Sequence, residues 1–186
     1  MPILSLVVIV ILAGPAPLVT QGPPNAIAKA RELIQQARYD AAIGRLEEVL
    51  EAEPNHPDAL MYMGTAILYS ERDYLKAKEW FEKSFRAGGG AAFLVSHSHE
   101  VLSTGDLADT CRGWLFLRKG EAEFASDKSE HAFRLSHSEI KEFKQNRLTR
   151  QMFHIEREKK NFNFRPRSGE EGEVLLILAL YKKFPG

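Results

Sequence analysis

The sequence predicts an α+β protein, with N-terminal helical hairpins followed by an antiparallel β-barrel or sheet that a C-terminal helix caps. Apolar residues recur at helical spacing from Asn25 to Ala87, alternate with polar residues after Ala91, and return to helical spacing from Glu171 to Phe184. The 186 residues, 44% of them hydrophobic and 27% charged, suffice for one or two domains with a hydrophobic core.

The helical region repeats itself after 34–35 residues, which predicts two successive hairpins over residues 25–90. Each copy places a small residue midway along its first helix and another early in its second, and a large apolar residue follows one turn later. Small residues beside large ones let two antiparallel helices approach closely. The equivalent positions are Ala30, Leu33, Tyr39, Ala42 and Leu46 in the first copy, and Gly64, Ile67, Tyr74, Ala77 and Phe81 in the second.

These positions resemble the tetratricopeptide repeat, a module that binds other proteins. The chain departs from that pattern in the turn Tyr69–Asp73, which carries one extra residue, and at Gly88-Gly89-Gly90, which replaces the usual closing proline. The resemblance implies that the first helix of each copy lines a concave binding groove. The site residues it implies are Ile27, Arg31, Gln35, Met61, Thr65 and Tyr69.

Two repeats alone form a marginal array, because the end repeats leave an apolar face uncovered and at least three repeats are usually needed. We therefore expect Trp80 or Phe85 to pack on the segment after Gly90 or on a second subunit.

Residues 1–22 predict a signal peptide. Ile3–Ala13 is an apolar run too short to span a bilayer comfortably, and Gly14-Pro15-Ala16 offers a cleavage region, although no Lys or Arg precedes the run. The protein is then expected to be exported, to a periplasmic or extracellular location. An uncleaved membrane anchor is the alternative.

Residues 91–186 predict short antiparallel strands and one amphipathic helix. Ser168 and Glu171 are expected to form a capping box at the start of that helix. The order of elements is similar to the pleckstrin-homology-like barrel, which implies binding of lipid head groups, and a basic stretch from Lys141 to Arg167 would serve it. The expected strand segments are 93–99, 112–117, 122–126, 132–135, 152–157 and 162–164.

No catalytic constellation is evident, so we expect no enzyme, no cofactor and no metal. His97-Ser98-His99 would point two imidazoles to one face of a strand, yet no acidic signature accompanies them. The single cysteine, Cys111, excludes an internal disulfide, and its apolar neighbours favour a buried side chain over a nucleophile. The net charge of zero argues against a general nucleic-acid binder.

Two functional hypotheses follow. The first is a non-catalytic exported scaffold that binds a protein or peptide in the concave groove. The second is a peripheral membrane protein that binds anionic lipid through the basic β region.

Overall fold

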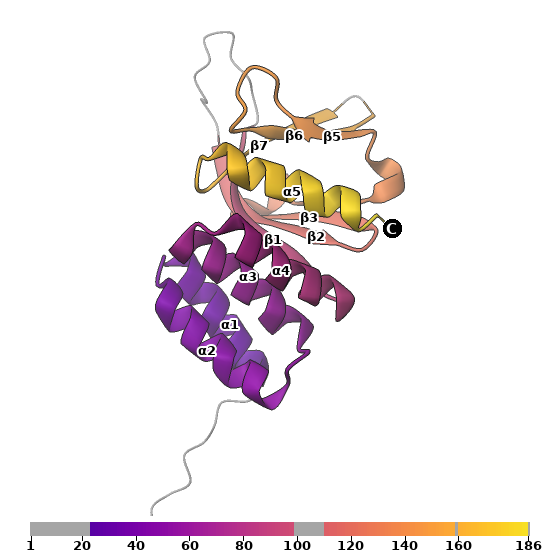
Figure 1. Cartoon of the computed structure of the whole chain (residues 1–186). Helices are drawn as coiled ribbons and strands as arrows, with labels where there is room; N and C mark the ends of the chain where they lie inside the picture. Colours follow the sequence, from indigo (N-terminus) through magenta and orange to yellow (C-terminus); the bar gives the residue numbers. More distant parts are fainter. Residues whose placement is uncertain (1–22, 99–109, 159, 186) are drawn as a thin grey trace, which may run out of the picture.

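The structure is a computed structural model that describes residues 23–98, 110–158 and 160–185, so the predicted signal peptide lies outside the described residues. It confirms the α+β class: four N-terminal helices, a seven-stranded antiparallel sheet and a C-terminal helix (Figure 1). Among the described helices, none combines the length and the apolar character needed to cross a membrane.

The N-terminal helices form two hairpins closed by short turns. The turns contain Ala37 and Arg72, whose positive φ values of 58° and 55° reverse the chain. The third helix starts as predicted with Pro57 in its first turn, and the Nδ1 atom of His56 accepts a hydrogen bond from the Ala59 N–H. The four helices are α1 (Pro23–Gln35), α2 (Tyr39–Ala52), α3 (Pro57–Glu71) and α4 (Tyr74–Arg86).

The small residues of the repeat lie at helix contacts, as predicted. Ala30, Ala42 and Ala77 have no solvent exposure. A Cβ atom on Gly64 would lie 2.8 Å from the ring of Phe81, so α3 and α4 touch at this position.

The sheet has the strand order β4-β3-β2-β1-β7-β6-β5 and all its neighbours are antiparallel. Among the described strands, no pairing joins β4 to β5, so the structure shows an open sheet and not a closed barrel. The short strand β5 was not predicted, because Phe143 is its only apolar residue. The strands are β1 (Gly90–Ser98), β2 (Thr110–Arg118), β3 (Glu121–Ser126), β4 (Phe133–Ser136), β5 (Glu142–Gln145), β6 (Phe153–Arg157) and β7 (Lys160–Pro166).

The C-terminal helix α5 (Glu171–Lys183) lies in the bend of the sheet, beside α4 (Figure 1). The ring of Phe85 stacks on Phe184 at 4.1 Å, which confirms that an aromatic of α4 packs on the C-terminal half of the chain. The predicted capping box is wrong. The carboxylate that accepts from the Ser168 N–H belongs to Glu173, at 3.2 Å, because α5 begins two residues later than a cap at Ser168 requires.

Helix α3 joins the helices to the sheet in one hydrophobic core. The ring of Tyr62 meets the indole of Trp114 edge to face at 5.6 Å. The Thr65 hydroxyl donates to the Ala92 carbonyl oxygen of β1 at 2.7 Å. One face of β1 and β2 is therefore covered by α3.

The chain turns from α4 into β1 through a tight glycine corner, Gly88-Gly89-Gly90. A Cβ atom on Gly89 would lie 2.4 Å from Ser84 Oγ, and one on Gly90 would lie 2.1 Å from the Leu117 carbonyl oxygen. Real Cβ atoms do not approach other atoms so closely, so the corner requires glycine at both positions.

We predict that Gly64→Ala lowers the free energy of unfolding by about 1–3 kcal/mol, because the new methyl group must displace the fully buried Phe81 ring. Urea denaturation of the purified variants measures the effect. Gly44→Ala is the matched control, since nothing lies within 4 Å of its Cβ position and alanine favours the helix by about 0.5–1 kcal/mol. Equal stabilities of the two variants would contradict the close approach of α3 and α4.

Candidate functional site

Four arginines from three parts of the chain meet where α1 approaches the sheet. Ser96 of β1 pairs with Arg112 of β2 on one side and with Arg165 of β7 on the other. Directly opposite residues of antiparallel strands share a face, so both side chains stand on the same face of the sheet. Arg31 of α1 and Arg167 after β7 complete the set.

These residues surround an open cavity of about 770 Å³, which we call the arginine cleft. Trp114 of β2 and the turn Ser168-Gly169 form further parts of its wall. Asp127 is the single acidic residue of the lining, and its carboxylate accepts a hydrogen bond from the Arg112 backbone N–H at 2.9 Å. A volume of this size is typical of ligand sites in proteins.

Two of the four arginine side chains contact neutral groups. The Arg31 guanidinium lies 5.6 Å from the centre of the Trp114 ring, and Arg167 donates to the Gln35 carbonyl oxygen at 3.2 Å. Within the described residues, none of the four guanidinium groups forms an ion pair with a carboxylate. Their charge is therefore available to a ligand.

Trp114 forms part of the wall beside these arginines. Its side chain is 1% exposed, and its buried indole N–H has no hydrogen-bond partner among the described residues. A buried donor without a partner typically costs about 1–3 kcal/mol.

The chemistry that this arrangement supports is recognition of anions. Each guanidinium offers a planar fork of N–H donors that matches the two oxygens of a carboxylate or the oxygens of a phosphate. A concave surface with one sign of charge also raises the local concentration of oppositely charged ligands.

The structure splits the six residues of the predicted groove. Arg31 and Gln35 line the arginine cleft. Ile27 lines a smaller neighbouring hollow, and Arg31 lines both this hollow and the cleft. Met61 and Thr65 are 1% and 0% exposed, so their expected place on an open concave surface is wrong. The reason is that β1 covers this face of α3.

Tyr69 is half-buried, and its hydroxyl group is hydrogen-bonded within the protein. The hydroxyl donates to the Glu173 carboxylate at 2.8 Å and accepts from the Leu94 N–H at 2.9 Å. Tyr69 therefore ties α3, β1 and α5 together and is not free to meet a partner.

The basic stretch Lys141–Arg167 does not form one surface. Three of its cations pair with carboxylates of the strands, of the segment before β5 or of α5, and only Arg165 and Arg167 line the cleft. The pairs are Lys144–Glu142, Arg150–Glu171 and Arg157–Glu139.

Arg112 and Trp114 were missed as site residues. Nothing in the local sequence around them signals a site. Only the strand order, which brings β7 next to β1 and opposite β2, places them beside Arg165.

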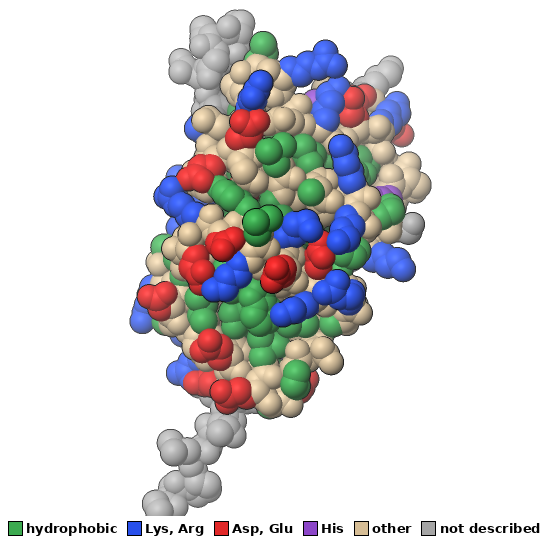
Figure 2. Space-filling view, in the orientation of Figure 1, with side chains coloured by type: hydrophobic (Ala, Val, Ile, Leu, Met, Phe, Trp, Pro, Cys, Tyr) green, Lys and Arg blue, Asp and Glu red, His purple; other side chains and the backbone are tan. Residues whose placement is uncertain are grey.

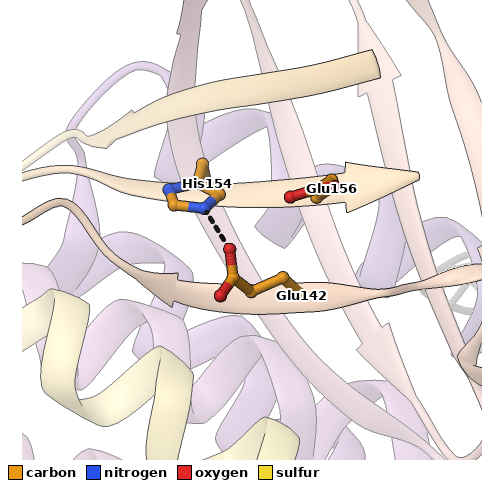
Figure 3. Close-up of side chains that lie close together, drawn as sticks. All are labelled: Glu142, His154 and Glu156. Carbon is orange, nitrogen blue, oxygen red and sulfur yellow. Dashed lines mark hydrogen bonds and ion pairs between the residues drawn. The ribbon is translucent and has the colours of Figure 1, made fainter. Parts of the chain in front are cut away.

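One cluster offers possible metal ligands on β5 and β6. Glu142, His154 and Glu156 present three ligand atoms within 4.8 Å of one another, and Figure 3 shows them on two neighbouring strands. His154 Nε2 is already 3.1 Å from Glu142, and Lys144 forms an ion pair with the same carboxylate. The lysine occupies the place of a cation, so we assign no metal to this cluster.

His97 and Cys111 lie inside the core of the β region, whereas His99 is outside the described residues. The His97 ring packs against Phe124 and Phe164, and its Nδ1 is 3.7 Å from the Cys111 sulfur. Burial raises the pKa of the Cys111 thiol, which disfavours the reactive thiolate. This placement agrees with a structural role for both residues.

Comparison with known proteins adds no relative: no family model matches the chain, and no curated protein matches it.

We predict that the buried carboxyl of Glu173 makes stability depend on pH. Burial raises the pKa of this carboxyl above its ordinary value of 4.5. The neutral carboxyl is thus favoured in the folded state. The contribution of Glu173 to the free energy of unfolding is full below about pH 4.5 and declines as pH rises through the raised pKa.

Thermal melts of the parent and of Glu173→Gln, from below pH 4.5 upward, measure the effect. The glutamine should gain stability relative to the parent as pH rises, because it never carries the buried charge. It loses one acceptor at Ser168, but that loss does not vary with pH. Parallel curves for the two proteins would contradict the prediction.

Proposed function

We propose that this chain is a non-catalytic binding protein, an adaptor, that holds an acidic peptide segment of a protein partner in the arginine cleft. The observation that carries the proposal is the set of four arginines, unpaired with carboxylates of the described residues, around one ligand-sized cavity. Arginine clusters are a recurring means of recognising acidic motifs.

The helical half supports the same class of function. Buried small residues at Ala42 and Ala77, and at Ala30 and Gly64, are what a pair of tetratricopeptide-type hairpins requires. In this proposal the sheet fills the groove that such hairpins usually offer, and binding moves to the edge where Arg31 meets the strands. Export of the protein remains a prediction from the sequence.

Binding to an anionic membrane is the second candidate. Leu148 is 94% exposed in the loop between β5 and β6, and Arg147 and Arg150 lie near it in the sequence. We favour the peptide because the basic stretch is divided by internal ion pairs, whereas a membrane surface is best met by a broad basic face.

We predict that Arg112→Ala and Arg165→Ala each weaken binding of a fluorescein-labelled, glutamate-rich peptide by about tenfold or more, since one charge-assisted hydrogen bond is worth about 1.5–3 kcal/mol. Fluorescence anisotropy at low salt measures the affinity. Both arginines are exposed, so neither change should unfold the protein.

Arg147→Ala is the matched control, because it removes an equal charge outside the cleft. Equal losses in all three variants would overturn the cleft as the binding site. Co-sedimentation with vesicles that contain phosphatidylglycerol tests the membrane. Vesicle binding that Arg147→Ala weakens, together with no peptide binding, would replace the peptide by lipid.

A further inference from the structure

A second hollow lies between α2 and α4, away from the arginine cleft. Its volume is about 470 Å³, and no residue lines both sites. Figure 2 shows apolar side chains gathered over the helical hairpins, with charged side chains around them. The apolar residues of this α2–α4 groove are Ile43, Leu50, Met63, Ile67 and Trp80.

The groove is built on the core of the helical half. Met63 and Ile67 of α3 are 3% and 4% exposed, and they belong to the same core as the rest of the helices. Trp80 of α4 is half-buried, and the Lys83 ammonium lies 4.4 Å from the centre of its ring. The groove therefore exists before a partner binds, which lowers the entropic cost of binding.

The charges of the groove are mainly acidic. Glu47 and Glu51 lie one helical turn apart on α2, and neither carboxylate forms a hydrogen bond or an ion pair within the described residues. On the opposite wall, the Lys76 ammonium is bound by both carboxylate oxygens of Glu71, at 2.8 and 2.9 Å. The uncompensated charge along the groove is thus negative.

We propose that the α2–α4 groove binds an amphipathic helix of a second partner, with an apolar stripe on the groove floor and Lys or Arg beside Glu47 and Glu51. A groove between two helices accepts a third helix by packing of ridges into grooves, and amphipathic helices use this mode widely. The basic flank follows from charge complementarity with the two free carboxylates. This site is independent of the arginine cleft and selects the opposite charge.

The probe is a fluorescein-labelled synthetic helix with a leucine stripe and a lysine flank, compared with the same helix carrying glutamate in the flank. Anisotropy with the full chain should show tighter binding of the lysine helix. The double variant Glu47→Lys, Glu51→Lys should weaken that binding by about tenfold or more and improve binding of the glutamate helix. Both positions are exposed, so the fold should persist.

The matched control is Glu79→Lys, Glu130→Lys, which makes the same change in net charge at exposed positions outside the groove and should change affinity by less than about twofold. Arg112→Ala should leave binding unchanged, which separates this site from the cleft. Trp80→Ala should weaken binding of both helices, with circular dichroism as the check on folding.

Equal affinity for the lysine and glutamate helices, or equal effects of the two double variants, would overturn the proposal. A dimer of the parent chain that Glu47→Lys, Glu51→Lys dissociates would also overturn it, because the occupant would then be a second copy. Analytical ultracentrifugation of the parent and both double variants measures that outcome.

Discussion

The burial of helix α3 is the constraint on which the rest of the structure depends. Every residue from Ala59 to Leu68 is buried, so this helix must be covered on all sides. Helices α2 and α4 cover part of it, and β1 covers the side that would otherwise be concave and open. The polar groups at that contact are satisfied across it, by Thr65 on Ala92 and by Tyr69 on Leu94. The sheet is therefore an integral part of the helical core and not a separate attachment.

Closing the concave side determines where ligands have access. Ligands can reach the edge between α1 and the sheet, where guanidinium groups gather, and the outer side of the hairpins, where Glu47 and Glu51 flank apolar side chains. The two surfaces share no lining residue, and we propose that they select opposite charges. A chain with zero net charge can thus carry two strongly charged sites, because charge acts locally at ordinary ionic strength.

Local patterns in the sequence predicted most of the elements. The 3.6-residue period and the small residues Ala42 and Ala77 predicted both hairpins. A short apolar run predicted β2, and the alternation of side chains along residues 152–157 predicted β6. The candidate site could not be predicted in the same way, because Arg31, Arg112 and Arg165 meet only through the strand order β2-β1-β7. The repeat pattern also misplaced Met61 and Thr65, since the spacing shows which residues share a helix face but not what covers that face.

The glycine corner between α4 and β1 affects how this molecule would organise its partners. The backbone at Gly89 and Gly90 packs against Pro57, Ser84 and Leu117 with no room for a methyl group. The junction is therefore closely packed. A linker of flexible coil lets attached bodies sample many separations, whereas a packed corner fixes both distance and direction. Two proteins bound on either side of this corner would therefore be held at a fixed distance and in a fixed relative orientation.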